Sequence, residues 1–178
     1  MVRTFVALWP PVEGADRLAA EAGAAARRSG ARPMPAADLH VTLAFIGELP
    51  DDALEPLGRT LHRALQRAAP GVPGAGDAIE LDRIGSFRGA NLCWLGPSAP
   101  PDWLPGLAQA VRDALDAAGV AFDRKPFAPH VTLARGARLP PAQIPPIAVR
   151  GWRVALVRSA AQAGAPGTGR YRVAAWLS

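Results

Sequence analysis

Short apolar, β-branched runs recur along the chain and alternate with alanine-rich stretches. The runs predict strands at residues 3–9, 38–47, 78–86, 91–96, 130–135, 147–157 and 171–177. The alanine-rich stretches favour helices at residues 13–28, 50–69 and 100–119. Loops are expected where glycine and proline gather, at residues 30–35, 70–76, 88–90, 137–146 and 163–169.

This order, with helices interspersed among strands, predicts an α+β fold. No linker is long enough to separate a second domain, so residues 1–178 are expected to form a single domain. The strands at residues 38–47 and 130–135 each follow a helix that itself follows a strand. This shared order indicates an internal duplication with weak symmetry.

The tetrapeptide His-Val-Thr-Leu stands in both of these strands, at residues 40–43 and 130–133. Side chains alternate between the two faces of a strand, so the first and third residues of each copy share one face. The valine and leucine of each copy then point to the other face, where they can be buried. Each copy is therefore expected to present an imidazole and a hydroxyl together.

Two such strands at one cleft can supply an acid and a base for phosphoryl chemistry. An imidazole gives or takes a proton near neutral pH, and a hydroxyl can donate a hydrogen bond to a phosphate oxygen. A single histidine in an apolar strand is usually structural. The chain has 3 histidines, and two of them open the repeated tetrapeptides, which favours a catalytic pair at His40 and His130.

Composition changes this picture only slightly. The formal net charge is +5, and all but one of the 20 basic residues are arginine, the exception being Lys125. Arginine matches phosphate oxygens well, which favours a polyanionic partner such as RNA. A GC-rich genome would produce the same arginine bias without a functional cause, so charge alone does not decide between these explanations.

The remaining features favour a cytoplasmic protein without a metal. No apolar run approaches the length of a membrane span, and the first residues are too short and proline-broken for a signal peptide. Cys93 is the only cysteine and lies in an apolar run, so a buried small side chain is expected. A metal site usually needs three or four ligands, and no third histidine or cysteine is placed to help the repeated pair. No dedicated interface is evident, and a monomer is expected.

The repeated tetrapeptides resemble the two His-x-Thr-x motifs of the two-histidine phosphoesterase superfamily. Within it the chain is most similar to the LigT-like branch, the RNA 2′,3′-cyclic phosphodiesterases formerly named 2′-5′ RNA ligases. The resemblance extends over nearly the whole chain, through RTFVAL (3–8), LHVTLAFIGEL (39–49), SFRGANLCWLG (86–96), APHVTLARGAR (128–138) and the C-terminal LVRSAAQ and YRVAAWLS segments.

This resemblance implies both a fold and an activity. The fold is bilobal, with two pseudo-symmetric lobes, each an antiparallel sheet with flanking helices, and the active-site cleft between them. The activity is metal-independent, cofactor-free hydrolysis of a 2′,3′-cyclic phosphate at an RNA end to a 2′-phosphomonoester. Two alternatives stay open: a two-histidine phosphodiesterase or ligase for 2′-5′ linkages or small cyclic nucleotides, and a non-catalytic module that binds RNA ends.

Carried over residue by residue, the resemblance assigns roles to the repeated motifs. His40 would protonate the leaving 3′ oxygen, and His130 would accept a proton from water. Thr42 and Thr132 would hold the non-bridging phosphate oxygens. Arg135 resembles a family arginine that contacts phosphate. Simple alternation places Arg135 on the face opposite His130, so a bulge or strand end is expected there.

Other side chains have two explanations each. Phe45, Phe87 and Trp94 can stack on an RNA base, although core packing is favoured for each. Arg3 is expected either in the cleft or on the exposed surface. Asp38 either orients the His40 imidazole or lies in a solvated loop, the second being favoured.

Two further positions have simpler expectations. His62 is expected on a solvated helix face. Many relatives carry arginine at the position of Ala128, so Arg124 or Lys125 replaces that charge here, or the contact with RNA is altered.

Overall fold

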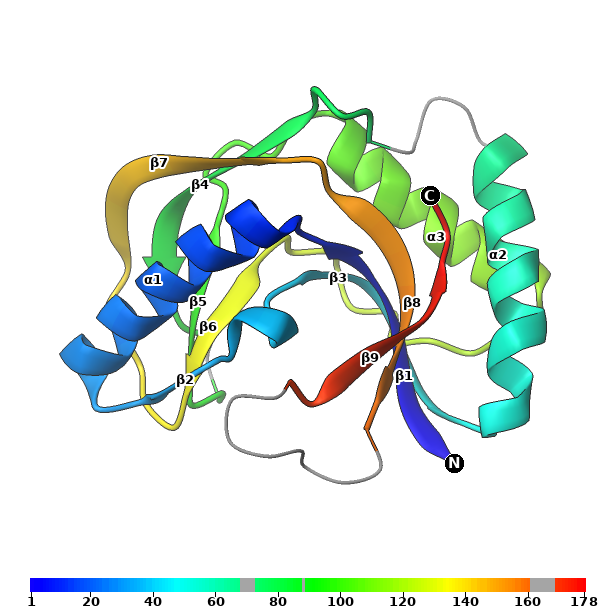
Figure 1. Ribbon diagram of the computed structural model, residues 1–178, viewed down its shortest axis with the longest axis horizontal. Helices are drawn as coiled ribbons and strands as arrows, with labels where there is room; N and C mark the ends of the chain where they lie inside the picture. Colours follow the sequence, from blue (N-terminus) through cyan, green and yellow to red (C-terminus); the bar gives the residue numbers. More distant parts are fainter. Residues whose placement is uncertain (68–72, 88, 161–168) are drawn as a thin grey trace.

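The computed structural model describes residues 1–67, 73–87, 89–160 and 169–178. Strands and helices follow one another in a mixed order, and the predicted α+β class is confirmed (Figure 1). The helices are α1 (Val12–Ser29), α2 (Leu54–Arg67) and α3 (Trp103–Ala117), with short 3-10 turns η1 (Ala36–Asp38) and η2 (Asp51–Ala53). The strands are β1 (Val2–Trp9), β2 (Arg32–Pro33), β3 (Val41–Leu49), β4 (Ala78–Gly85), β5 (Leu92–Gly96), β6 (Val131–Arg135), β7 (Ala142–Arg150), β8 (Arg153–Ser159) and β9 (Tyr171–Trp176).

The strands form one open sheet in the order β7-β4-β5-β6-β3-β1-β8-β9, with β2 added beside β6. All described pairings are antiparallel. Between β3 and β6 the described pairing is a single residue pair, Val41 with Val131. The two predicted lobes are therefore two halves of one sheet, β3-β1-β8-β9 and β7-β4-β5-β6, which meet at this seam.

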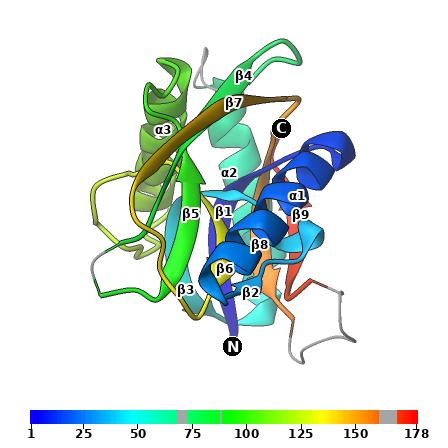
Figure 2. The same cartoon turned by 90° about the vertical axis from the view of Figure 1, so that its left-hand side faces the viewer.

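Each half is covered by a helix that follows a strand of the other half. Helix α1 follows β1 but packs against β2, β6 and β7, whereas α3 follows β5 but packs against β3 and α2 (Figure 1). Figure 2 shows α1 and α3 well apart in the side view. The same strand-to-helix crossover thus occurs once in each half, as the predicted duplication requires. The two helices also connect the halves of the sheet in addition to the β3–β6 pairing.

The alternation predicted for the repeated tetrapeptides is confirmed by burial. Val41, Leu43, Val131 and Leu133 are at most 1% exposed and belong to the main core, together with leucines from all three helices. The histidine and threonine of each copy are only partly buried. The valines and leucines on one face of the seam therefore pack into the core, and the histidines and threonines on the other face can contact a ligand.

Each copy carries a β-bulge directly after its threonine. Across β1, Val6 pairs with Ala44 and Ala7 with Thr42, which leaves Leu43 as an extra residue. The same irregularity on β6 leaves Leu133 unpaired between Thr132 and Ala134. Because of the bulge, the alanine that follows stays on the core side, and the residue after it, Phe45 in β3 and Arg135 in β6, lies on the face of the threonine.

Two expectations about loops and strands were wrong. The proline-rich connector at residues 137–146 contributes the first half of β7. Prolines fit there because β7 lies at the sheet edge, and its register with β4 shifts between Leu81 and Arg83. The single strand predicted at 147–157 is divided between β7 and β8 at Gly151, whose φ of 71° needs glycine.

Several predicted segments lie partly outside the described residues. They are the end of the helix predicted at 50–69, the loop predicted at 70–76, the turn around 88–90 and the tip at 163–169.

Two helix glycines are expected to respond oppositely to alanine. At Gly106 in α3 nothing lies near an added Cβ, so Gly106→Ala should stabilise the fold by about 0.5–1 kcal/mol. At Gly58 in α2 the added Cβ would lie 2.8 Å from the Cβ of Ala175 on β9, which cannot rotate away. Gly58→Ala should therefore cost about 1–3 kcal/mol despite better helix propensity. Urea unfolding of both variants checks this, and stabilisation by Gly58→Ala would contradict the packing of α2 on β9.

Candidate active site

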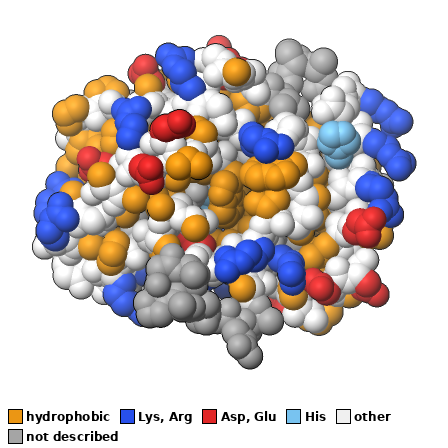
Figure 3. Space-filling model, viewed as in Figure 1, with side chains coloured by type: hydrophobic (Ala, Val, Ile, Leu, Met, Phe, Trp, Pro, Cys, Tyr) orange, Lys and Arg blue, Asp and Glu red, His pale blue; other side chains and the backbone are white. Residues whose placement is uncertain are grey.

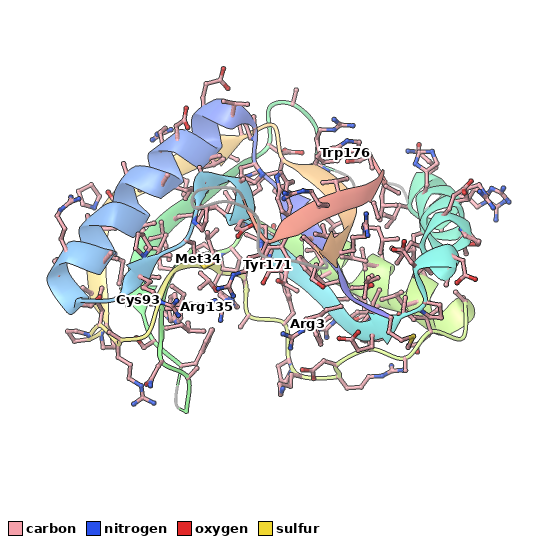
Figure 4. The ribbon with its side chains drawn as sticks, turned by 60° about the horizontal axis from the view of Figure 1, so that its bottom comes forward. Arg3, Met34, Cys93, Arg135, Tyr171 and Trp176 are labelled. Carbon is pink, nitrogen blue, oxygen red and sulfur yellow. The ribbon has the colours of Figure 1, made fainter. Side chains whose placement is uncertain are left out.

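The histidine face of the seam opens into a pocket of about 260 Å³, here called the phosphate pocket because the family resemblance implies that the two motifs hold a phosphate. All the site residues predicted from the sequence line it: Arg3, His40, Thr42, Phe45, His130, Thr132 and Arg135. Figure 4 shows Arg3, Arg135 and Tyr171 converging from β1, β6 and β9 on the space between the two halves. The structure thus brings the two tetrapeptides together, although 90 positions separate them in the chain.

The Val41–Val131 pair fixes how the two motifs face each other. In an antiparallel pair the numbering rises along one strand as it falls along the other. Continued by one residue each way, this register places His40 across from Thr132, and Thr42 across from His130. Each histidine is therefore partnered by the threonine of the other copy, and an approximate twofold axis passes through the seam.

Both imidazoles are held by the same backbone interaction. Nδ1 of His40 lies 2.7 Å from the carbonyl oxygen of Asp38, and Nδ1 of His130 lies 2.7 Å from that of Ala128. A carbonyl oxygen only accepts, so each Nδ1 must carry the proton. In the neutral imidazole Nε2 is then the free basic nitrogen, on the side of the ring away from this anchor.

Aromatic rings surround both histidines, but His40 is the more enclosed. Its ring stacks on Trp9 with an interplanar angle of 2° and on Phe5 at a centroid distance of 4.9 Å, while Tyr171 meets it edge-on at 5.4 Å. His130 meets Phe87 edge-on at 4.8 Å.

This enclosure sets the protonation of the pair. Burial lowers the pKa of His40 from 6.5 to about 4, against the opposing effects of the Asp38 carbonyl and carboxylate, which raise it. Burial also lowers the pKa of His130, as does the nearby Arg135. In the unliganded protein both imidazoles are therefore neutral near pH 7.

Of the two roles expected for Asp38, the structure supports the orientation of His40, through the backbone carbonyl, and not the solvated loop. Its side chain is 1% exposed, so it does not lie in a solvated loop. Its carboxylate accepts the backbone N–H groups of Arg170 at 2.9 Å and Tyr171 at 3.1 Å, while its own carbonyl oxygen orients His40. Asp38 thus joins the first motif to the start of β9.

Tyr171 is a polar pocket residue that the sequence reasoning did not identify; the apolar Phe5, Met34 and Leu92 also line the pocket without having been predicted. Tyr171 lines the phosphate pocket and contacts the His40 ring edge-on. The available signals were that it is the only tyrosine of the chain and that it begins the C-terminal segment YRVAAWLS. Neither signal reveals that Asp38 places it beside His40.

Two arginines supply positive charge to the phosphate pocket. The Arg3 guanidinium lies over the Phe45 ring at 5.0 Å and lines the phosphate pocket, and the residue is also exposed, so both expectations for Arg3 describe it. In the described part of the chain, neither Arg3 nor Arg135 forms an ion pair with a carboxylate. On the face shown in Figure 3, basic side chains are dispersed among acidic and apolar ones, so the net charge is not gathered into one patch there. The pocket arginines therefore give this cleft a local affinity for anions.

The aromatic residues near His130 are not core residues, contrary to expectation. Phe87 and Trp94 are only partly buried, and both line a pocket beside His130. Phe45 is also partly buried and lines the phosphate pocket. All three rings are therefore available to a ligand.

The charged residues near Ala128 differ in position. The Arg124 guanidinium forms an ion pair with Asp116 and lies over Phe122 at 4.1 Å. Lys125 pairs with Asp123 at 2.8 Å and, like Ala128, lines a pocket that includes His130. Of the two candidate replacements for an arginine at position 128, Lys125 is the one beside the site.

His62 and Cys93 lie where the sequence predicts them. His62 lies exposed on α2, as predicted, with Nδ1 3.1 Å from the carbonyl oxygen of Leu177. Cys93 is buried, as predicted. Among the described residues there is no helix long and apolar enough to cross a membrane, and no group of three histidine, cysteine, aspartate or glutamate side chains is suited to holding a metal ion.

Comparison with protein families gives one match over most of the chain. A family described as the 2′-5′ RNA ligase superfamily matches residues 10–160. An RNA 2′,3′-cyclic phosphodiesterase of Escherichia coli K12 is 34% identical over 106 residues, or 60% of this chain and 56% of that protein. A Thermus thermophilus protein of the same name is 30% identical over 153 residues, covering 82% of this chain and 74% of the relative. A third, from Geobacillus stearothermophilus, is 33% identical, and the match spans only 30% of its length.

Solved structures show the same fold. Escherichia coli LigT complexed with 3′-AMP has a TM-score of 0.70 and 28% identity, covering 96% of this chain and 92% of that one. The structure of a Thermus thermophilus protein also has a TM-score of 0.70, with 26% identity over 98% of this chain and 96% of its own.

Acidification is expected to destabilise the protein through His40. Between pH 6.5 and about 4 the unfolded chain binds a proton at this residue that the folded protein does not. The stability contribution is therefore complete above pH 6.5 and is lost as the pH falls toward 4, by about 3 kcal/mol. Urea unfolding at several pH values checks this, with His40→Asn as the control that lacks the titrating group. An equal pH dependence in both proteins would contradict the burial of this imidazole.

Removing the charge of Asp38 is expected to loosen β9 from the first motif. In Asp38→Asn one of the two backbone N–H groups loses its acceptor, which should cost about 2–3 kcal/mol of unfolding free energy. Asp77→Asn is the matched control, because its carboxylate also accepts a backbone N–H, from Gly74, but at the exposed surface. Denaturant unfolding compares the two, and equal losses would argue against a special role for Asp38.

Proposed function

The chain belongs to the 2′-5′ RNA ligase superfamily, and on that premise we propose that it hydrolyses 2′,3′-cyclic phosphate at RNA ends to a 2′-phosphomonoester. The observation that carries this proposal is the matched pair of motifs in the phosphate pocket. Two imidazoles in the same tautomer and two hydroxyls meet there beside two arginines without carboxylate partners in the described chain. Such a set suits one phosphorus atom approached from two opposite sides.

In the proposed reaction the phosphate lies between the two histidines. Thr42 and Thr132 donate hydrogen bonds to its non-bridging oxygens, and Arg135 supplies positive charge, with Arg3 and Phe45 at the rim. Nε2 of His130 takes a proton from water as the water oxygen bonds to phosphorus. The bond from phosphorus to the 3′ oxygen breaks, and His40 gives that oxygen its proton. The phosphate remains on the 2′ oxygen.

The acid role of His40 requires that substrate binding change its protonation. The pKa of His40 in the unliganded protein is about 4, so a protonated His40 is scarce near pH 7. A phosphodiester anion bound beside the ring favours the imidazolium and raises this pKa. The Asp38 carboxylate acts in the same direction, and the second motif has Ala128 at the equivalent position. The Asp38 carboxylate thus only lessens the effect of burial, and the roles of His40 as acid and His130 as base are carried over from the family resemblance.

The proposal assigns every proton transfer to a protein side chain, so the reaction is proposed to proceed without a metal. Both halves of the sheet contribute a histidine, and the single domain of residues 1–178 is proposed to act as one catalytic unit. We propose that it works as a cytoplasmic monomer on RNA ends.

Small nucleotides are the second candidate class of substrate. Structures of the relative LigT are described as complexes with 3′-AMP, with ATP and with NADP+. A cyclic mononucleotide or a 2′-5′ linkage would present the same phosphodiester to the two histidines. Binding without turnover would instead indicate a module that only recognises RNA ends.

Loss of either motif histidine is expected to abolish most of the activity. On an oligonucleotide ending in 2′,3′-cyclic phosphate, His40→Ala and His130→Ala should each lower kcat on the order of 10²- to 10⁴-fold, because each removes one proton transfer. His62→Ala is the control and should leave kcat unchanged. The assays include excess chelator, and unchanged rates in either motif variant, or loss of wild-type activity with chelator, would contradict the proposal.

The pH dependence of the rate separates the two histidine roles. The wild-type profile should be bell-shaped, because it needs one neutral and one protonated imidazole. If His40 is the acid, the residual activity of His40→Ala should lose the alkaline limb and keep the acidic one. His130→Ala should show the reverse, and the opposite pattern would exchange the two roles.

A further inference from the structure

Two additional pockets adjoin the phosphate pocket, one between the two halves of the sheet and one in the half that carries His130. The near pocket, of about 290 Å³, shares Thr42, Phe45 and His130 with the phosphate pocket. The far pocket, of about 230 Å³, shares only His130 with the phosphate pocket, but shares Phe87, Ala128 and His130 with the near pocket. The three pockets therefore meet at His130, with Phe45 between the phosphate and near pockets and Phe87 between the near and far pockets.

The near pocket has the lining expected for one nucleoside. Its walls include the rings of Phe45, Phe87 and Phe127, which offer apolar surface to a base. Arg112 and Lys125 add donors at the same site. Because this pocket adjoins Thr42 and His130, it suits the nucleoside that carries the reacting phosphate.

The far pocket is built around an indole that lies flat on the sheet. A Cβ on Gly85 would lie 2.5 Å from Cζ2 of Trp94, and one on Gly96 would lie 3.4 Å from Cζ3 of the same ring. The absence of side chains at these positions lets the indole rest against β4 and β5. Phe87 stacks on Trp94 at a centroid distance of 5.4 Å, and the Arg83 guanidinium lies over the indole at 5.6 Å.

The other wall of the far pocket is also fixed. Ser98 donates from its backbone N–H and its hydroxyl to the Asp82 carboxylate, at 2.7 and 2.6 Å. Arg83, in contrast, is exposed and forms no ion pair within the described residues. The pocket thus combines a preformed aromatic surface with an available cation.

Two buried nitrogen atoms without a hydrogen-bond partner among the described residues belong to side chains that line the same two pockets. Nε1 of Trp94 and Nε of Arg112 are the buried side-chain nitrogens for which the described chain provides no hydrogen-bond partner. Trp94 lines the far pocket and Arg112 the near one. Both atoms are covered by protein, so they belong to the walls of the two pockets and not to the surface that a ligand would touch.

We propose that the far pocket binds a second nucleoside, the one preceding the nucleoside that carries the cyclic phosphate. This inference rests on the proposed function and defines its substrate more narrowly, as an RNA end of at least two nucleotides. The penultimate base stacks in the space formed by Phe87 and Trp94, and Arg83 contacts the phosphodiester that links the two nucleosides. Ala128 contributes only a methyl group where the near and far pockets meet.

The test compares a cytidine 2′,3′-cyclic phosphate mononucleotide with a dinucleotide that ends in the same cyclic nucleotide. One stacked base changes binding by about tenfold or more. The wild-type kcat/KM should therefore be higher on the dinucleotide by roughly that factor. Arg83→Gln and Trp94→Leu should each lower the ratio of the two values several-fold toward one. Arg83→Gln serves as the variant that preserves the fold, because Arg83 is exposed.

Arg153→Gln is the matched control, because Arg153 also lies over an indole, that of Trp176, at 4.0 Å, and lines none of the three pockets. Its ratio should equal that of the wild type. Equal wild-type kcat/KM on both substrates would overturn the second-nucleoside site and leave the proposed hydrolysis intact. An unchanged ratio in both Arg83→Gln and Trp94→Leu would also overturn it. No turnover of either substrate would overturn the hydrolysis itself, and this inference with it.

Discussion

A single residue pair, Val41 with Val131, determines the arrangement of the whole site. It is the described pairing between β3 and β6, and hence between the two halves of the sheet. Both valines are completely buried, so hydrophobic packing against the helices holds the register. A shift of either strand by one residue would turn the histidine of that strand toward the core and its valine and leucine toward the pocket. Because the pair is antiparallel, the same contact makes two copies of one motif face each other across one pocket.

The bulge after each threonine brings a chemically different side chain to the pocket from each copy. Without it, the residue after the Leu-Ala step would lie on the core side. With it, Phe45 in one copy and Arg135 in the other reach the pocket. The duplicated backbone therefore has the same shape in both copies, while the residue at this point differs in chemistry. Asp38 and Ala128 form a similar contrast: their carbonyl oxygens orient the histidines equally, but only Asp38 adds a carboxylate.

Much of this site follows from the sequence because it depends on local geometry. Alternation along a strand places His40 with Thr42 and His130 with Thr132, and the parity of Arg135 already requires a bulge or a strand end. The roles of Asp38 and Tyr171 do not follow, because they depend on a contact between the first motif and β9, more than a hundred residues apart. The aromatic rings of Phe87 and Trp94 were expected in the core for a similar reason. An aromatic side chain suits a core or a binding pocket equally well, and only the sheet topology places these two beside His130.

A crystal structure with inorganic phosphate or vanadate bound would test whether the two motifs form one site. The geometry of the seam predicts a single anion at the phosphate pocket. Its oxygens should lie within hydrogen-bonding distance of Nε2 of both His40 and His130 and of the hydroxyls of Thr42 and Thr132. An anion held by one motif alone, or two anions bound separately by the two motifs, would contradict a shared phosphorus centre.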